Sequence, residues 1–591
     1  MSIRMLKIVV SVILVSLVVA GSRLNAAEST ASRKPNVVII LADDQGWGDL
    51  SVHGNKNLST PQIDSLARDG ALFERFFVCP VCAPTRAEFL TGRYHSRGGV
   101  RGVSLGQERL NLDEKTLADH LKSAGYATGI FGKWHNGTQY PYHPVGRGFQ
   151  EFYGYTSGHW GQYFDAPMEH NSEYVQGKGY INDDLTDHAM AFITQHQADS
   201  FLCYLPLATP HSPFMVPDEY WNRFADAAIV MRSVLGDKED IAKTRSVLAM
   251  VENIDWNVGR VLKKLDELKL TENAVVIYFS DNGPNTQRWN GGMKGIKAST
   301  DEGGVRVPFL IRWPGHIPAG MRVLKIAGAI DLLPTIAAMT QTPLGEHKPL
   351  DGVDLSPLLT GRPVDWADRT IFTHQSNKFS ARTQQYRMDA AGALYDMEKD
   401  PSQKKNISSQ QPEVAKKLGD QVMEFRKIVP KDADDRPYLV GYREFPVTYL
   451  PARDGVPHGN VARSAKAPNC SYFTKWIDPS DSITWDVQVN TPGEYEVILH
   501  YTCGKDDLGS TVEVAFLNST VEGKITVAND PPLWDKQDRV PRDQESYIKA
   551  FKPMTLGTIH LQAGHDKLTV RAKQIAGKQV MDLSMIQLKL K

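Results

Sequence analysis

The sequence predicts an α/β domain followed by a β-sandwich. Three apolar runs rich in β-branched and aromatic residues, 36–41, 201–207 and 274–279, alternate with helical patterns, and each leads directly into polar residues. This alternation is typical of a sheet flanked by helices, which binds ligands beyond the carboxyl ends of its strands. After about residue 453 the helical periods vanish. Short alternating runs separated by Gly, Pro, Asn and Asp clusters then indicate a sandwich.

The individual elements follow from hydrophobic periodicity and from turn residues. In the first part of the chain we expect, in order, a strand over 36–41, a helix over 61–73, a helix stopping at Gly125, a strand over 127–131, a strand over 201–207, a helix over 241–268, a strand over 274–279 and a helix over 414–426. In the last part we expect strands over 482–489, 493–501, 510–516, 557–561, 567–572 and 585–590.

Length and charge limit the classes of protein that remain. A chain of 591 residues is too long for one core, so at least two domains are expected. The 67 Lys and Arg residues are balanced by 68 Asp and Glu residues. This balance gives no sign of a nucleic-acid partner or of an anionic membrane surface.

The N-terminus has the pattern of a secretory signal peptide over 1–26. Arg4 and Lys7 precede an apolar run, and small residues follow at Ala26 and Ala27. The alternative is an uncleaved membrane anchor, but the apolar run is short for a bilayer span of roughly 20 residues. We therefore expect an exported protein, periplasmic or secreted, with no stable membrane insertion after cleavage.

The most informative motif is CAPTRAEFLTGR, which begins at Cys82. The pattern C-x-P-x-R followed by L-T-G-R resembles the signature of type I sulfatases, which belong to the alkaline phosphatase-like superfamily. The resemblance implies that a maturation enzyme oxidises Cys82 to formylglycine, whose hydrated aldehyde attacks sulfur. The plain alternative for a lone cysteine is a small buried hydrophobic residue.

Two acidic pairs at strand ends suggest a metal site. Asp43 and Asp44 follow the first strand, and Asp281 and Asn282 follow the strand over 274–279. Carboxylate and amide oxygens suit Ca²⁺, or Mg²⁺, rather than a softer metal. An isolated Asp pair is more often a helix cap or a solvated turn. The resemblance assigns all four residues as metal ligands, with the oxygen of the converted Cys82 completing the set.

Three cationic side chains occur within motifs that match the family. Arg86 belongs to the cysteine motif, Lys133 to GKWHNG, and Lys297 precedes the EGG-x-R-x-P element. A sulfate ester is anionic, so positive charge is needed to stabilise its oxygens during reaction. We expect these residues, and in particular the planar fork of Arg86, to bind the oxyanions.

Proton transfer is assigned to two histidines and one carboxylate. His211 lies in TPHSPF and is expected to protonate the leaving oxygen together with Lys297. His135 is expected to take a proton from the sulfated hydrate, and Asp281 from the attacking hydroxyl. A lone histidine is more often a structural residue, so these roles rest on the resemblance.

The resemblance also divides the chain. It covers about 36–426 and includes the element ALYDMEKDP at 393–401, which is similar to the small C-terminal subdomain of sulfatases. We predict a sulfatase catalytic domain over 33–362 with helices flanking its sheet, an α+β subdomain over 363–449, and an accessory β-sandwich over 450–591. Every catalytic candidate precedes the sandwich, so a chain ending near Tyr449 is expected to keep activity on a small aryl sulfate.

The leading functional hypothesis is an exported hydrolase of sulfate esters on carbohydrates. A phosphonate monoester hydrolase or phosphodiesterase of the same superfamily is the first alternative, and a degenerate glycan-binding protein is the second. In the sandwich, Trp476, Trp485 and Trp534 are available to stack on sugar rings, or they are core aromatics. We further expect Cys79 to be free, and leave open whether Cys470 pairs with Cys503.

Overall fold

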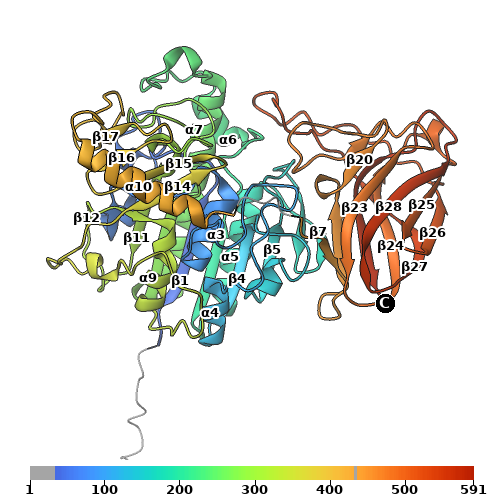
Figure 1. Ribbon diagram of the computed structural model, residues 1–591, viewed down its shortest axis with the longest axis horizontal. Coiled ribbons are helices and arrows are strands. Elements are labelled where there is room, and N and C mark those ends of the chain that lie inside the picture. Colours follow the sequence, from blue (N-terminus) through green and yellow to red (C-terminus); the bar gives the residue numbers. More distant parts are fainter. Residues whose placement is uncertain (1–32, 431–434) are drawn as a thin grey trace, which may run out of the picture.

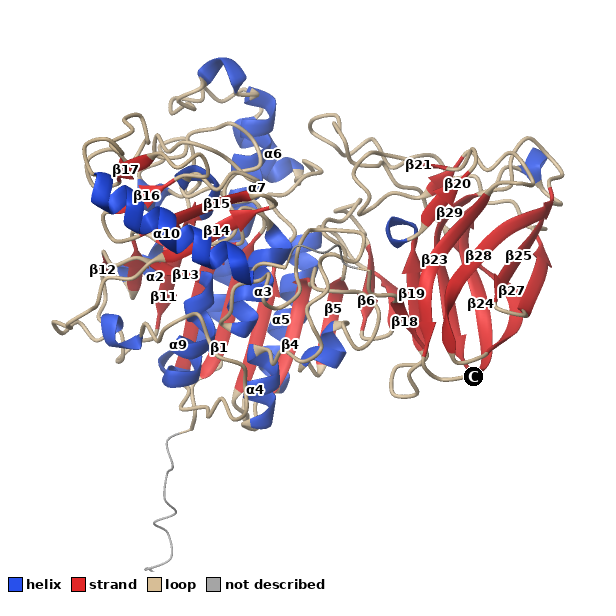
Figure 2. Cartoon of the chain, viewed as in Figure 1, coloured by secondary structure: helices blue, strands red, loops and turns tan. Residues whose placement is uncertain are grey.

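A computed structural model describes residues 33–430 and 435–591, and the predicted signal peptide at 1–26 lies outside these residues. Two bodies lie side by side, an α/β body and a β-sandwich (Figure 1). Helices cover the sheet of the first body, whereas the second is almost entirely strands and loops (Figure 2). Within the described residues, no helix combines the length and apolar character needed to cross a membrane.

The first body is built on a ten-stranded sheet. In spatial order its strands are β12 (Met321–Val323), β2 (Ala71–Phe73), β11 (Phe309–Arg312), β9 (Ala274–Ser280), β1 (Asn36–Ala42), β8 (Phe201–Pro206), β4 (Ala127–Lys133), β5 (Glu151–Tyr155), β6 (Pro167–His170) and β7 (Glu173–Gln176). The central strands from β9 to β5 are parallel, so their carboxyl ends share one edge.

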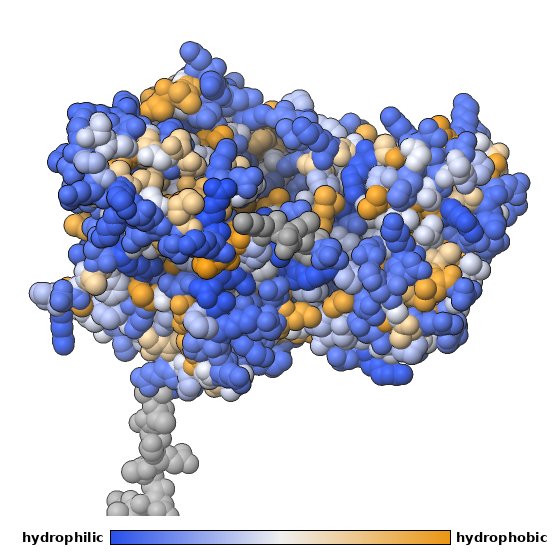
Figure 3. Space-filling view, in the orientation of Figure 1, coloured by the Kyte–Doolittle hydropathy of each residue, from blue (hydrophilic) through white to orange (hydrophobic). Residues whose placement is uncertain are grey.

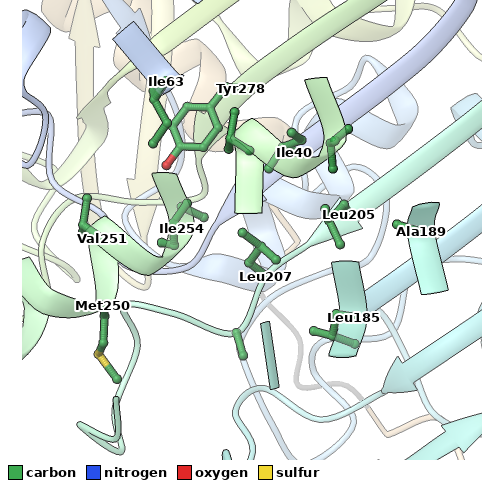
Figure 4. Packing of buried hydrophobic residues seen from close by; sticks show 14 of the residues in the cluster. Ile40, Ile63, Leu185, Ala189, Leu205, Leu207, Met250, Val251, Ile254 and Tyr278 are labelled. Atoms are coloured by element: carbon green, nitrogen blue, oxygen red, sulfur yellow. The ribbon is translucent and has the colours of Figure 1, made fainter. Parts of the chain in front are cut away.

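Helices cover both faces of this sheet. They are α2 (Pro61–Arg68), α3 (Cys82–Thr91), α4 (Leu117–Ser123), α5 (Ile181–Gln195), α6 (Asp218–Phe224), α7 (Ile241–Glu267) and α9 (Leu332–Met339). The short helix α8 (Glu302–Val305) packs in a separate small cluster. Alternate residues of β1 serve the two cores: Val38 and Ile40 join one cluster, and Val37 and Ile39 join the other. On the first face, side chains of α5 and α7 pack against β1 and β8 (Figure 4). This two-sided burial explains the continuous apolar runs of the central strands.

One predicted helix is shorter in the structure than the sequence indicated. The helix expected over 61–73 ends at Arg68, and residues 71–73 form β2 instead. The reason is tertiary: a Cβ at Gly70 would lie 2.3 Å from the carbonyl oxygen of Ile311, so the chain at this point passes directly against β11. Residues 71–73 then pair with β11 and β12.

Two small sheets complete the first body. One contains β10 (Arg306–Val307), β3 (Phe76–Phe77) and β13 (Ala327–Gly328). The other contains β14 (Ile371–Gln375), β15 (Lys378–Arg382), β16 (Tyr386–Met388) and β17 (Leu394–Asp396), and α10 (Pro412–Ile428) packs on it. This second sheet and its helix form an α+β unit within the range predicted for the subdomain.

The second body consists of two sheets enclosing a separate core. One holds β18 (Tyr438–Val440), β23 (Ser482–Val489), β28 (Gly564–Gln574), β25 (Thr511–Phe516) and β26 (Ser519–Lys524), with β20 (Val456–His458) paired to β23. The other holds β21 (Ala462–Arg463), β22 (Phe473–Thr474), β29 (Asp582–Leu590), β24 (Gly493–Thr502) and β27 (Lys552–Leu561), with β19 (Val447–Pro451) paired to β29.

The strands of this body begin earlier than the predicted boundary at residue 450. Strand β18 starts at Tyr438, and the boundary itself falls within β19. Trp476 and Trp485 are 1 % and 0 % exposed and belong to the core, so they are not available to a sugar. Cys79 is a free, buried residue as expected, and Cys470 and Cys503 are also free rather than paired.

Candidate active site

The predicted polar residues gather at the carboxyl edge of the central strands. Asp43 and Asp44 follow β1, Asp281 and Asn282 follow β9, and Lys133 is the last residue of β4. His211 follows β8, and Lys297 reaches the same edge from the long connection between β9 and α8. All of the predicted site residues except His135 are linked to one another by ion pairs, by hydrogen bonds or by ligand atoms within 4.8 Å.

Cys82 is the first residue of α3, and its side chain is buried. Its sulfur and one oxygen each of Asp43 and Asp281 lie within 4.8 Å of one another. Burial raises the pKa of the Cys82 thiol, so an unmodified cysteine is poorly ionised here. Thr85, one turn further along, donates its hydroxyl to the carbonyl oxygen of Asp281 at 2.6 Å and fixes α3 against the end of β9.

Each carboxylate at this edge has a cationic partner. Lys133 Nζ lies 2.6 Å from Asp43 Oδ2, and Lys297 Nζ lies 2.6 Å from Asp44 Oδ1. His211 Nε2 lies 3.5 Å from Asp44 Oδ2. The Lys133 side chain is completely buried, whereas that of Lys297 is 20 % exposed, so Lys297 is the lysine that faces solvent.

Arg86 has a partner that sequence reasoning did not predict. Its Nε and Nη2 donate to Asp281 Oδ2 at 3.1 and 2.7 Å, and its Nη1 donates to the carbonyl oxygen of Lys133 at 2.8 Å. The guanidinium is fully buried. Its fork therefore binds a site carboxylate and joins α3, β4 and β9, rather than facing open space where an oxyanion would bind.

Several buried oxygen atoms of the site have no hydrogen-bond donor within residues 33–430 and 435–591. They are Asp43 Oδ1, Asp44 Oδ2 and Asn282 Oδ1, while Asn282 Nδ2 donates to Asp44 Oδ1 at 2.7 Å. Buried oxygens without partners are rare because their desolvation is not compensated. Carboxylate and amide oxygens are the donors that hard divalent cations prefer. These residues therefore fit a Ca²⁺ or Mg²⁺ ion.

Burial and neighbouring charges shift the pKa values of the site residues. Burial, with Asp281 nearby, raises the pKa of Asp43 to about 8. Burial opposes ionisation of Asp44 as well, but His211 and Lys297 together hold its pKa below the ordinary range. Burial lowers the pKa of His211 to about 4 and that of His135 well below its ordinary value. A bound divalent cation would favour the ionised forms of these carboxylates.

Three residues of this region have strained backbone conformations. Asp44, His135 and Ala298 have φ angles of 70°, 64° and 65°, in the left-handed region that residues with a Cβ seldom adopt. Asp44 and His135 are predicted site residues, and Ala298 follows Lys297. Such strain persists where the surrounding structure determines the side-chain direction, as it commonly does at functional sites.

His135 is buried beside the cluster. Its Nε2 lies 2.8 Å from the carbonyl oxygen of Val103, and its Nδ1 has no hydrogen-bond partner among the described residues. Sequence reasoning missed two neighbours of the histidines. The ring of His159 stacks on His211 at 5.5 Å, and Glu545 comes from the sandwich. No sequence motif marks His159 or Glu545, because the position of each beside His211 depends on contacts between distant segments.

Comparisons with known proteins identify the family of this chain. A family model described as sulfatase matches residues 35–342, more than half of the chain. A second, described as the C-terminal part of N-sulphoglucosamine sulphohydrolase, matches residues 297–428. Human N-acetylgalactosamine-6-sulfatase is 34% identical over 381 residues, which is 60% of this chain and 71% of that protein. Human arylsulfatase A is 34% identical over 378 residues, which is 57% and 70% of the two chains.

Solved structures share the fold. Ps i-CgsB in complex with k-i-k-neocarrahexaose superposes with a TM-score of 0.61 at 29% identity, covering 68% of this chain and 94% of that one. The phosphonate monoester hydrolase of Agrobacterium radiobacter has a TM-score of 0.52 at 21% identity over 67% and 96% of the two chains, a likeness of fold alone. The predicted alkaline phosphatase-like sulfatase fold is confirmed. The chain belongs to the sulfatase family and is a sulfuric ester hydrolase.

Proposed function

We propose that the protein is an exported hydrolase of sulfated carbohydrates that uses a formylglycine derived from Cys82 and a bound Ca²⁺ or Mg²⁺. The observation that carries this proposal is the position of Cys82. It begins α3 and lies within 4.8 Å of oxygens of Asp43 and Asp281, beside other buried oxygens that lack donors. A maturation enzyme that oxidises Cys82 is therefore a required partner.

The formylglycine and the cation would each supply one part of the chemistry. When formed, the hydrated aldehyde at position 82 supplies the hydroxyl nucleophile. When bound, the cation polarises a sulfate oxygen and offsets negative charge. The oxygens of Asp43, Asp44, Asp281 and Asn282 would hold that cation.

The remaining residues bind charge and move protons. Lys133 and Lys297 bring two positive charges to an edge where the substrate is anionic. Lys297 and His211 both contact Asp44, and together they would protonate the leaving oxygen. Asp281 would accept the proton of the attacking hydroxyl, and His135, with its free Nδ1, would accept the proton released with sulfate. Arg86 is a positioning residue, since its fork holds Asp281.

The carbohydrate assignment is supported by a cavity whose lining reaches residues beside the site. The lining includes Cys470, which contacts the carbonyl oxygen of His159, and the His159 ring stacks on His211. The cavity has a volume of about 470 Å³, and it lies between the two bodies. Its lining also includes Trp160, Tyr174 and Trp534 together with Arg453 and Lys549. Aromatic faces stack on sugar rings, and cationic side chains bind sulfate groups. The visible face of the molecule is otherwise mostly hydrophilic, with hydrophobic residues scattered in small groups (Figure 3).

The proposal is tested by comparing two small substrates. We expect the matured protein to hydrolyse an aryl sulfate with a kcat/KM on the order of 100-fold above that for the matching aryl phosphodiester. A reversed preference would favour the phosphonate monoester hydrolase or phosphodiesterase alternative. Export is tested separately, by N-terminal sequencing of the protein recovered outside the cytoplasm, where cleavage near Ala26 is expected.

The cavity makes a second prediction. Trp534→Ala is expected to raise KM for a sulfated oligosaccharide roughly 3- to 10-fold, the loss of one aromatic contact. It should leave KM for a small aryl sulfate unchanged. Trp256→Ala is the matched control, because Trp256 is 45 % exposed on α7 and lies outside this cavity. Equal KM values for the two variants on the oligosaccharide would remove the cavity from the substrate site.

A further inference from the structure

Two segments of the sandwich extend toward the catalytic edge. Residues 525–551 connect β26 to β27, and residues 464–472 connect β21 to β22. Neither matched family model extends past residue 428, so both segments lie outside the region shared with the family. Their contacts nevertheless reach the residues around His211 and His135.

The longer segment is anchored firmly on the first body. Arg539 donates through Nη2 to the carbonyl oxygen of Val216 at 2.6 Å, and Arg542 donates through Nη2 to that of Gly161 at 2.9 Å. Asp543 also pairs with Lys243 of α7 at 2.6 Å, but its side chain is 71% exposed, so this pair contributes little to the anchoring. The two arginine contacts lie shortly before Glu545 in sequence and fix its position relative to the α/β body.

Glu545 is connected to His211 through Ser212. The Ser212 hydroxyl donates to Glu545 Oε1 at 2.6 Å, and the same oxygen lies 3.8 Å from His211 Nδ1. His211 Nδ1 lies 2.6 Å from the carbonyl oxygen of Ser212, which assigns the proton to Nδ1. Nε2, which is directed toward Asp44, is then the nitrogen that would carry the proton for the leaving oxygen. The Glu545 side chain is only 14 % exposed, so this contact is largely shielded from water.

The shorter segment reaches the other two histidines. The Ser157 hydroxyl donates to the main-chain carbonyl oxygen of Asn469 at 2.9 Å. The Cys470 thiol contacts the main-chain carbonyl oxygen of His159 at 2.9 Å. A Cβ at Gly158 would lie 2.3 Å from Asn469 Nδ2 and 2.6 Å from His135 Nε2. The Asn469 side chain therefore lies next to His135, with room only for a glycine between them.

We propose that the C-terminal sandwich completes the active site, and that Glu545 is a positioning residue that holds His211 through Ser212. This rests on the proposed function, which gives His211 its role in proton transfer. It replaces the expectation that a chain ending near Tyr449 keeps its activity. Removal of the sandwich would also remove the contacts to Ser212, Ser157 and His159.

The test uses the full-length matured protein and an aryl sulfate. Glu545→Ala is expected to lower kcat roughly 10- to 100-fold, the effect of losing one buried charged hydrogen bond, with KM changed less than about 3-fold. Glu545→Gln keeps an acceptor for Ser212 and should recover most of the loss. Asp543→Ala is the matched control, since it removes a carboxylate of the same segment whose side chain is 71% exposed. Equal kcat for Glu545→Ala and Asp543→Ala would overturn the proposal.

A second pair of variants separates positioning from general destabilisation. Ser212→Ala breaks the same connection while leaving the Glu545 charge in place. If the two residues act as one chain, the double variant should lose no more activity than the worse single variant. Losses that multiply would contradict a shared path through Ser212.

A readout without catalysis distinguishes failure of this inference from failure of the proposed function. Diethyl pyrocarbonate modifies accessible imidazoles, and peptide mass spectrometry reports the rate at His211. We expect Glu545→Ala to raise this rate several-fold over wild type and over Asp543→Ala. If the wild-type protein is inactive but the variants show these differences in modification rate at His211, only the proposed function is contradicted. An unchanged modification rate at His211 in Glu545→Ala would overturn the positioning role, whether or not sulfate esters are hydrolysed.

Discussion

Cys82→Ala is expected to abolish sulfate ester hydrolysis, lowering kcat by at least about 10⁴-fold, as loss of a covalent nucleophile typically does. Alanine keeps the helix start, since it carries no new polar group and is smaller than cysteine in a fully packed position. The unfolding transition should therefore move little. The variant separates nucleophilic chemistry from folding because, in the part of the chain that the structure describes, the hydrogen bonds of the site do not involve the Cys82 sulfur.

The control for this variant is Cys203→Ala. Cys203 is also a free, buried cysteine, but it lies within β8, in the core rather than at the carboxyl edge. Its removal should leave kcat within about 3-fold of wild type, as is usual for a core change that touches no site residue. Mass spectrometry of the tryptic peptide 76–86 measures conversion directly. A fully active preparation in which this peptide carries only unmodified cysteine would contradict the formylglycine mechanism.

The strand ends explain why so much of the site was predictable. The runs before Asp43 and before Asp281 are continuous and apolar because both faces of β1 and β9 are buried. Parallel strands then bring their carboxyl ends to one edge, so local patterns were enough to place both acidic pairs together. The register confirms this, since Ala42 is paired with Ser280 immediately before the two pairs.

The features that the sequence did not predict depend on contacts between distant segments. Arg86 lies one helical turn after Cys82, but the sequence does not indicate that its fork binds Asp281, 195 residues away. Glu545 follows no recognisable motif, and its relation to Ser212 depends on how a sandwich connection folds back over the α/β body. Trp476 and Trp485 had two equally reasonable interpretations, and only the packing of the two sandwich sheets assigns them to the core.

Asp281→Asn is expected to remove the bound cation and to lower kcat at least about 10²- to 10³-fold, the typical cost of losing one electrostatic contact to the reacting group. Asn is similar in shape, but it has no charge. It would leave the buried Arg86 guanidinium without its anion and replace one candidate metal ligand. Both effects weaken cation binding without enlarging the site.

Metal content and thermal unfolding measure this effect directly. For wild type, saturating Ca²⁺ or Mg²⁺ should stabilise the folded state by about 2.7 kcal/mol at 100 times Kd, and chelation should reverse the shift. Asp281→Asn should show neither response. Asp183→Asn is the matched control, because Asp183 on α5 accepts hydrogen bonds from Asn253 and Asn257, which are not among the candidate metal ligands, and its variant should respond like wild type. Activity that survives complete chelation, or that zinc alone restores, would contradict an oxygen-ligated Ca²⁺ or Mg²⁺ site, because these ligands are matched to hard cations.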